Sequence, residues 1–344
     1  MYLGERGYSK GETDKTLFIN KTNIDLIVAQ INVDDIIFGG FPKTLVNNFI
    51  NIMKSEFEMS LVDEQSCFLG LQTKQRSERM FISQEKYVKN LVKKFGLDQS
   101  QYKRTPVATH AKITKDTVGT AIDHKLYRSM IGSLLYLTAS RPDIAYAVGT
   151  CAQYQSDPRT SHLNAVKRII KYVHGTTDFG ILYSYGTSSE LVRYCDADWA
   201  GSADDRKSTS SGCFFLGNNL VSWLSKKQNC VSLSTAEAEF IAAGSGCTQM
   251  IWMKNMLNEY EIIQDVITLY CDNMSAIDIS KNPVHHSRTK HIDIRHHFIR
   301  DLIENKVITL QHVRSNSQLA DIFTKPLDAT TFEHLRACLG VCKI

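Results

Sequence analysis

The chain has 344 residues, of which 43% are hydrophobic and 22% are charged, so it can bury a sizeable core and wholesale disorder is excluded. At roughly 150 residues per domain, this length predicts two or three domains. No apolar run reaches the roughly 18 residues that a membrane span needs, and charges occupy the N-terminal stretch where a signal peptide would be apolar. The nine cysteines form no CxxC pair, which favours reduced thiols in an intracellular protein, cytoplasmic or nuclear, over a disulfide framework.

The net charge of +4 is unevenly distributed along the chain. From Lys74 to Arg128, 13 Lys and Arg stand against 5 Asp and Glu, and Lys93 and Lys94 belong to this segment. A basic segment between two others is a candidate surface for the phosphates of a nucleic acid. A solvated protein face would explain the charge equally well.

The first hundred residues predict mixed α and β structure. The run from Asp25 to Phe38 consists of two apolar stretches broken by Asn32 and the pair Asp34–Asp35, which predicts two buried strands joined by a tight acidic turn. The apolar spacing predicts further elements: a helix over 43–58, strands at 67–71 and 80–82, and a helix over 87–95 that ends at Gly96.

A loop from Thr105 to Ala121 is the candidate linker, and a series of helices and short strands follows it. Three helices are expected over 127–138, 143–154 and 158–174. Beyond them we expect strands at 191–196, 212–216 and 220–224, a helix over 234–246, a strand at 267–272 with a short helix after it, a helix over 291–304, a strand at 308–314 and a last helix over 318–324.

Four carboxylates in this last segment occupy strand ends and helices: Asp196, Glu239, Asp272 and Asp321. Grouped carboxylates repel one another, and two Mg²⁺ ions that neutralise them can hydrolyse a phosphodiester. Spacing alone leaves the convergence open, because 36 acidic residues make chance sets common.

Neighbouring residues sharpen this choice. Cys195 and Cys271 precede two of these acids, and alternation on a strand predicts a buried thiol behind each site-facing carboxylate. Glu237 competes with Glu239, but two helical positions lie about 200° apart and Glu237 fits a capping box that begins at Ser234.

Several long strings resemble the Pol polyproteins of copia-type retrotransposons. Those similar to the ribonuclease H region are YCDADWAG at 194–201, RKSTSSGCFFLG at 206–217, VSWLSKKQ at 221–228, LSTAEAEFIAA at 233–243, YCDN at 270–273, RTKHIDIRHHFIR at 288–300 and ADIFTKPL at 320–327. Those similar to the reverse transcriptase and connecting regions are VAQINVDDIIFGG at 28–40, FLGLQ at 68–72, YRSMIGSLLYLT at 127–138 and RPDIAYAV at 141–148.

The resemblance implies an α/β fold in three parts. Residues 1–105 would be an α+β remnant of the reverse transcriptase palm and thumb, residues 106–185 a helical connection, and residues 186–344 a ribonuclease H-like mixed sheet with helices. The implied activity is metal-dependent hydrolysis of the RNA strand of RNA–DNA hybrids with two Mg²⁺, or Mn²⁺ as an alternative. By motif, the metal ligands would be Asp196, Glu239, Asp272 and Asp321, with Asp198 as the alternative to Asp196.

The polymerase part departs from the family's YVDD turn, since residues 32–35 read NVDD. No motif for the further metal-binding Asp of the polymerase precedes this turn. We therefore expect a truncated palm in which Asp34 and Asp35 form a vestigial metal site and nucleotide transfer is lost.

Five histidines lie between His285 and His297. The interleaved Arg288, Lys290 and Arg295 favour contact with a nucleic-acid backbone. A solvated helix and a zinc site that uses some of these histidines remain the alternatives.

Three hypotheses follow from the sequence. The first is an enzyme that cuts RNA–DNA hybrids, with the basic segment holding the hybrid or another duplex. The second is a catalytically inactive relic that binds nucleic acid, and the third is a decaying copy that does not fold stably.

Overall fold

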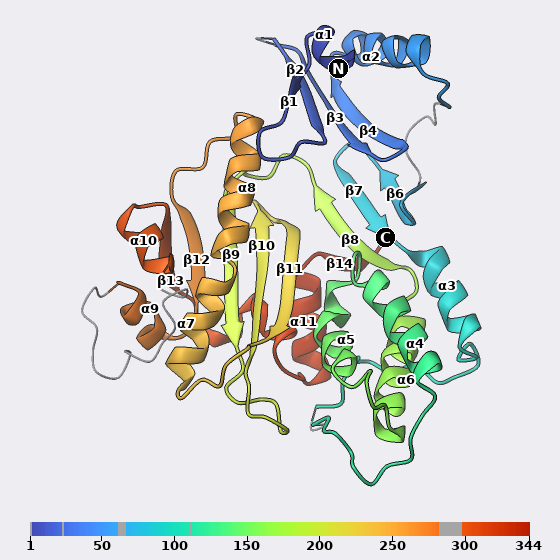
Figure 1. Ribbon diagram of the computed structural model, residues 1–344, viewed down its shortest axis with the longest axis vertical. Helices are drawn as coiled ribbons and strands as arrows, with labels where there is room; N and C mark the ends of the chain where they lie inside the picture. The colour runs from blue at the N-terminus through green and yellow to red at the C-terminus, as the bar shows by residue number, and fades with distance from the viewer. Residues whose placement is uncertain (1, 23, 61–66, 110–111, 282–297) are drawn as a thin grey trace. The chain divides into compact units, whose positions relative to one another are not determined.

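The computed structural model of the chain describes residues 2–22, 24–60, 67–109, 112–281 and 298–344 (Figure 1). The chain forms two compact units, the first from residues 1–65 and 251–264 and the second from residues 66–250 and 265–344. Helices and sheets are combined in both, which confirms the predicted α/β class. Within the described ranges, no helix is both long and apolar enough to cross a membrane.

The first unit contains a four-stranded sheet in the order β1-β2-β3-β4. Its elements are α1 (Tyr2–Glu5), β1 (Ser9–Lys10), β2 (Leu17–Lys21), β3 (Leu26–Asn32), β4 (Asp35–Phe41), α2 (Lys43–Glu56) and the residues from 251 onward of α8 (Cys247–Glu259). Strands β3 and β4 pair with Asn32 opposite Asp35, so the predicted tight turn is confirmed.

The prediction that both strands of this hairpin are buried is wrong. Ile27 and Ala29 of β3 are buried beside Phe49 and Met53 of α2, whereas every residue of β4 is at least partly exposed. The sheet buries one face only, so alternate residues of its strands reach solvent.

The second unit contains an antiparallel sheet in the order β14-β8-β7-β6-β5. Its strands are β5 (Cys67–Phe68), β6 (Leu71–Gln75), β7 (Arg79–Ser83), β8 (Phe179–Ser184) and β14 (Val341–Lys343). The sequence did not predict β8 or β14. The three-part domain division stays a prediction, although this sheet pairs strands from all three of its parts.

A helical layer belongs to the same unit (Figure 1). Its elements are α3 (Glu85–Lys94), α4 (His124–Leu137), the short 3₁₀ helix η1 (Pro142–Ile144), α5 (Ala145–Ala152), α6 (Thr160–His174) and α11 (Ala329–Cys338). The predicted helices are confirmed, and Gly96 follows α3 with a φ of 64°, a value that favours glycine. The expected helix over 318–324 is not the last, because α11 and β14 follow it.

A buried ion pair at η1 contacts residues at the C-terminal end of α6 and so joins these two elements of the helical layer. The Arg141 guanidinium donates to both carboxylate oxygens of Asp143, at 2.9 and 2.8 Å, and to the Thr176 carbonyl at 2.9 Å. The Tyr172 hydroxyl also donates to Asp143. Burial alone would raise the pKa of Asp143, but the Arg141 charge and the hydrogen bonds from Arg141 and Tyr172 together outweigh burial and lower that pKa.

The mixed sheet of the second unit has the order β11-β10-β9-β12-β13. Its strands are β9 (Leu191–Ala197), β10 (Thr209–Leu216), β11 (Asn219–Lys227), β12 (Ile267–Cys271) and β13 (Ile308–His312). Strands β9 to β11 form the predicted antiparallel meander, and β12 runs parallel to both β9 and β13. This arrangement confirms the predicted mixed sheet.

Helices cover this sheet, and their bounds differ in part from those expected. They are α7 (Thr235–Ser245), α9 (Met274–Lys281), α10 (Phe298–Glu304) and the 3₁₀ helix η4 (Leu319–Phe323). Of the helix expected over 291–304, only the part from 298 lies within the described residues. Helix α8 was not predicted.

We expect Asp143→Asn to lower the free energy of unfolding by about 3–5 kcal/mol, because it leaves the Arg141 charge buried without its bidentate partner. The Asp143 pKa is lowered on folding, so the ionised carboxylate stabilises above its ordinary value of 3.8 and this contribution disappears as the pH falls. Urea unfolding at neutral and acid pH should show that the difference in free energy of unfolding between the wild type and the variant becomes smaller as the pH falls.

The matched control for this variant is Asp157→Asn. It removes the exposed pair that Asp157 forms with Arg159 at 2.7 Å and should cost less than about 1 kcal/mol. Equal losses in the two variants would contradict a structural role for the buried pair.

Candidate active site

Two of the predicted carboxylates reach the same edge of the mixed sheet because their strands are parallel neighbours. Tyr194 of β9 lies opposite Tyr270 of β12 in the register. Asp196 lies two residues after Tyr194, and Asp272 lies two residues after Tyr270. Both acids are therefore at the ends of their strands, β9 and β12. Asp196 is almost fully buried, at 2% exposure, whereas Asp272 is partly exposed.

The other two carboxylates approach from helices. Glu239 lies on α7, and its Oε1 accepts a hydrogen bond of 3.2 Å from the backbone N–H of Ala197, beside Asp196. Asp321 lies on η4, which packs against β9 and β10. Burial raises the pKa of Asp196, of Glu239 and of Asp321, and the charge of Asp272 contributes to all three shifts, so these three side chains lie within range of the Asp272 charge. We call these four residues the carboxylate cluster.

Capping residues orient the helix that carries Glu239. The Ser234 hydroxyl accepts a hydrogen bond of 3.1 Å from the Glu237 N–H. The Glu237 carboxylate in turn accepts one of 2.8 Å from the Leu233 N–H. Ser234 therefore caps the helix as predicted, whereas Glu237 accepts from the residue before the cap and not from the Ser234 N–H of a full capping box. Glu239 is the acid of this helix that reaches the cluster.

The electrostatics of the cluster are those of buried acids held close together. Burial, with the neighbouring Asp196 charge, raises the pKa of Glu239 to about 11 and that of Asp321 to about 7. Burial also raises the pKa of Asp196, although the Lys325 ammonium partly offsets this effect. Ionising Asp196, Glu239 and Asp321 together at neutral pH is therefore costly without a bound cation.

The donor chemistry of the cluster fits a divalent metal ion. Ligand atoms of Glu239, Cys271 and Asp272 all lie within 4.8 Å of one another. Carboxylate oxygens suit Mg²⁺ and Mn²⁺. A hydrogen bond with Cys195 and burial raise the pKa of the Cys271 thiol, so it stays protonated and is a poor ligand.

Cys271 differs from its predicted place. It is buried, as expected, but its Sγ lies 3.8 Å from Glu239 Oε2 and so faces the cluster. Strand alternation predicted that Cys271 points away from the site, on the opposite face of the sheet from Asp272. The pattern cannot take account of helix α7, which brings Glu239 to the face on which the thiol lies.

Asp198 stays the alternative to Asp196. It follows β9, and its carboxylate accepts a hydrogen bond from the Thr209 N–H. Burial, with a contribution from Asp196, raises the pKa of Asp198 to about 6.

Three polar residues that support the cluster were not predicted. Thr324 donates a hydrogen bond to Asp196, and Ser315 donates one of 2.9 Å to Asp272. Lys325 Nζ lies 2.9 Å from Asp321 Oδ1 and 4.0 Å from Asp196 Oδ2. Thr324 and Lys325 lie within the ADIFTKPL string, which was the one available signal for them.

A buried arginine joins two of the elements that form the cluster. Arg193 of β9 is fully buried, and its guanidinium donates to the carbonyls of Ala243 and Ala242, at 2.7 and 2.9 Å, near the end of α7. A Cβ on Gly246 would lie 2.1 Å from Arg193 Cζ, and one on Gly212 would lie 2.9 Å from its Nε. Glycine at both positions therefore leaves the room that the guanidinium fills.

The remaining predicted residues lie apart from the cluster. Lys93 and Lys94 are exposed in the last turn of α3, where Lys94 Nζ donates to Ser129 Oγ at 3.2 Å. Asp34 and Asp35 are exposed at the hairpin turn of the first unit. The residues of the histidine-rich segment lie outside the described ranges, namely Arg288, Lys290, Arg295 and the five histidines from 285 to 297.

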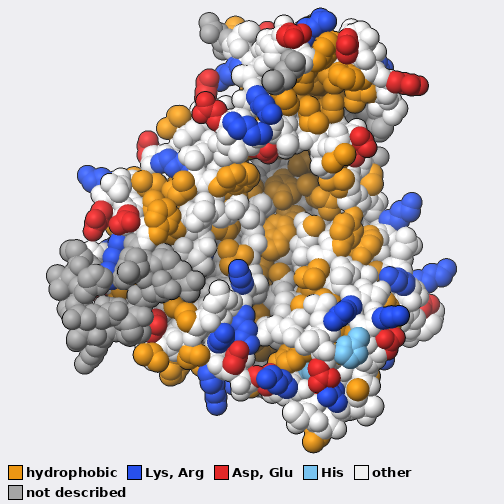
Figure 2. Space-filling view, in the orientation of Figure 1, with side chains coloured by type: hydrophobic (Ala, Val, Ile, Leu, Met, Phe, Trp, Pro, Cys, Tyr) orange, Lys and Arg blue, Asp and Glu red, His pale blue; other side chains and the backbone are white. Residues whose placement is uncertain are grey.

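Basic side chains do not form one continuous patch on the face that Figure 2 shows. Lys and Arg are scattered singly over the part of this face where α3 to α6 lie. The basic segment therefore stays a prediction as a phosphate-facing surface.

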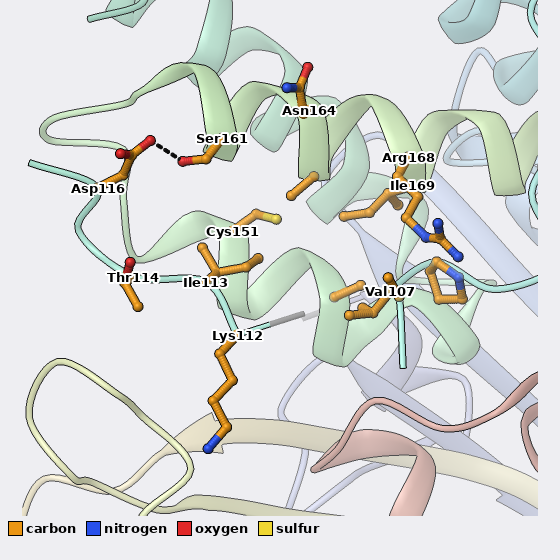
Figure 3. A pocket seen from close by; sticks show the side chains of 14 residues that line it. Val107, Lys112, Ile113, Thr114, Asp116, Cys151, Ser161, Asn164, Arg168 and Ile169 are labelled. Atoms are coloured by element: carbon orange, nitrogen blue, oxygen red, sulfur yellow. Dashed lines mark hydrogen bonds between the residues drawn. The ribbon is translucent and has the colours of Figure 1, made fainter. Parts of the chain in front are cut away.

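The second unit also contains a cavity of about 470 Å³ beside α5 and α6 (Figure 3). Cys151, Arg168 and the hydrogen-bonded pair Asp116 and Ser161 are among its lining residues, while the Lys112 side chain extends away from the others. No residue of the carboxylate cluster lines this cavity.

Comparison with known sequences places the whole chain among transposon polyproteins. The family described as reverse transcriptase (RNA-dependent DNA polymerase) matches residues 1–109. The retrovirus-related Pol polyprotein from transposon RE1 of Arabidopsis thaliana is 35% identical over 344 residues, which are 100% of this chain and 24% of that polyprotein. The polyprotein from transposon TNT 1-94 of Nicotiana tabacum is 34% identical over 99% of this chain and 26% of its own length. The chain thus spans about a quarter of these relatives.

Among solved structures, the N-terminal ribonuclease H domain of Rv2228c from Mycobacterium tuberculosis covers 44% of this chain and 98% of its own, with 8% identity and a TM-score of 0.30. LC11-RNase H1, isolated from compost, covers 38% of this chain with a TM-score of 0.30. The description of the fold accordingly rests on the strand order of the mixed sheet.

We expect Arg193→Met to lower the free energy of unfolding by about 2–4 kcal/mol, because it removes two charge-assisted hydrogen bonds to the end of α7. Denaturant unfolding measures the loss, and amide hydrogen exchange should show faster opening of α7. The control Arg104→Met removes an exposed pair with Glu333 and should leave both readouts nearly unchanged. Unaltered hydrogen exchange in α7 of the Arg193 variant would contradict the role of Arg193 in holding α7 against β9.

Proposed function

Since the chain belongs to the family of copia-type, retrovirus-related Pol polyproteins, we propose that its second unit hydrolyses the RNA strand of RNA–DNA hybrids in a metal-dependent reaction. The observation that carries this proposal is the convergence of Asp196, Glu239, Asp272 and Asp321 at one edge of the mixed sheet. The relatives are named as retrovirus-related Pol polyproteins of transposons, and removal of an RNA template from a hybrid is a reaction that a reverse-transcribing element requires.

The four carboxylates are the proposed metal ligands. Two Mg²⁺ ions bound there, or Mn²⁺ in their place, would supply an activated water and would stabilise the leaving 3′-oxygen of the RNA. The Ala197 N–H holds Glu239 in the cluster, and the hydroxyls of Thr324 and Ser315 hold Asp196 and Asp272. Hydrolysis would leave a 5′-phosphate and a 3′-hydroxyl on the cut RNA.

The proposed substrate is recognised by its shape. A hybrid presents a 2′-hydroxyl on one strand only, and contacts to this group and to the phosphates are independent of base sequence. Lys93 and Lys94, together with Arg288, Lys290 and Arg295, are the proposed contacts to the phosphate backbone of the hybrid or another duplex. All nine cysteines are free thiols, which supports an intracellular site of action, cytoplasmic or nuclear.

DNA synthesis is not part of this proposal. Polymerase chemistry needs metal ligands beyond Asp34 and Asp35, and among the residues that the structure describes no third metal-ligating side chain is grouped with these two. We propose that this pair is vestigial in the chain as given.

The experiment that tests the proposal is cleavage of a labelled RNA–DNA hybrid by the purified full chain, with Mg²⁺ and with EDTA. We expect metal-dependent cleavage of the RNA strand. Asp272→Asn should reduce the rate by at least about 10²-fold, because loss of a ligand should exceed the effect of losing a supporting residue.

The matched control for this experiment is Asp278→Asn, which changes an exposed acid on α9 outside the cluster. It should cleave at the wild-type rate. If a folded chain binds the hybrid but does not cut it, the hydrolase proposal is wrong and the binding relic is the better interpretation.

A further inference from the structure

The carboxylate cluster divides into two sides that differ in how their charge is balanced. On one side, Glu239 and Asp272 belong to the group whose ligand atoms lie within 4.8 Å of one another. On the other side, Asp321 lies 2.9 Å from the Lys325 ammonium, and Asp196 lies 4.0 Å from it. Among the residues that the structure describes, Lys325 is the basic side chain that pairs with Asp321 and approaches Asp196, and Glu239 and Asp272 form no ion pair.

Lys325 is placed for this contact by the backbone of its own segment. It follows Asp321 by four residues, and its N–H donates to the Asp321 carbonyl at 3.3 Å, continuing the turn that η4 begins. This geometry keeps the ammonium beside Asp321. Its side chain is 41% exposed, so the group also has an open path to solvent.

This arrangement differs from the surface ion pairs of the same unit. Lys227 contacts Asp205 at 2.8 Å and Lys343 contacts Asp178 at 2.6 Å, and in both pairs the acid is substantially exposed. Lys325 instead approaches two largely buried acids that come from different elements, β9 and η4. Solvent consequently screens the acids of this contact less than the acids of the two surface pairs.

We propose that Lys325 is the resident cation of the Asp196–Asp321 side of the cluster. It restricts the first divalent ion to the side of Glu239 and Asp272, and a second ion binds only after the ammonium is displaced toward solvent. Lys325 is thus a positioning residue that makes the affinity for the second ion lower than the affinity for the first. It rests on the proposed function, since that function requires divalent ions at these acids.

The test measures cation binding without nucleic acid. Mn²⁺ is titrated into the purified full chain at neutral pH, and free Mn²⁺ is followed by electron paramagnetic resonance. We expect one tighter and one weaker site in the wild type. Lys325→Gln should tighten the weaker site by about tenfold, because a unit positive charge a few ångströms away is removed.

Two variants distinguish a charge effect from a general change of structure. Lys325→Arg keeps the positive charge and should retain the wild-type separation of the two sites. Lys227→Gln removes a lysine whose partner, Asp205, is an exposed acid outside the cluster, and it should leave both affinities unchanged. Thermal unfolding of each variant reports whether the fold is intact.

The proposal is overturned if Lys325→Gln and the wild type bind the same number of Mn²⁺ ions with the same affinities, including the case in which neither binds any. It is also overturned if Lys325→Arg behaves like Lys325→Gln. Tightening in the Gln variant, together with a failure of the wild type to cut a hybrid, would support the role of Lys325 and refute the proposed hydrolysis.

Discussion

The geometry of the carboxylate cluster depends on one buried cation, the guanidinium of Arg193. It lies three residues before Asp196 on β9 and binds the carbonyls of residues 242 and 243, about one turn after Glu239 on α7. One planar group thus fixes a strand and a helix relative to each other at the point where their carboxylates meet. A lysine could not form both bonds in this way, because its ammonium lacks the planar fork of arginine.

Two buried charge arrangements in the second unit contrast with each other. Arg141 and Asp143 neutralise one another with bidentate geometry, and nearby polar groups satisfy the rest of their hydrogen bonds. Within the described part of the chain, the carboxylate cluster gathers four acids around one nearby lysine, Lys325, and stays short of positive charge. Such a deficit is unfavourable for stability and is typical of a site that binds a cation, since local rules of packing and charge are broken mainly where function requires it.

Local patterns predicted most of the fold, whereas the four acids of the cluster were singled out by the resemblance of their motifs, because spacing alone left their convergence open. The β3–β4 hairpin, the helices from α2 to α7 and the choice of Glu239 over Glu237 follow from periodicity, capping and the angle between helical positions. Strand β8 was missed because its partners in β7 and β14 lie far away in the sequence. The roles of Arg193 and Lys325 could not be predicted, because a charged residue on a strand or turn gives no local sign of the distant group that it pairs with.

The sheet that contains β8 has a consequence for the order in which the protein folds. Residues 79–83 pair with residues 179–184, and these pair in turn with residues 341–343. Pairings across such sequence separations are slow to form, because the loops between them must close first. On the ribosome, one edge of β8 therefore stays unpaired until synthesis has passed residue 343. During that interval the nascent chain exposes a strand edge that a chaperone could cover or another chain could join.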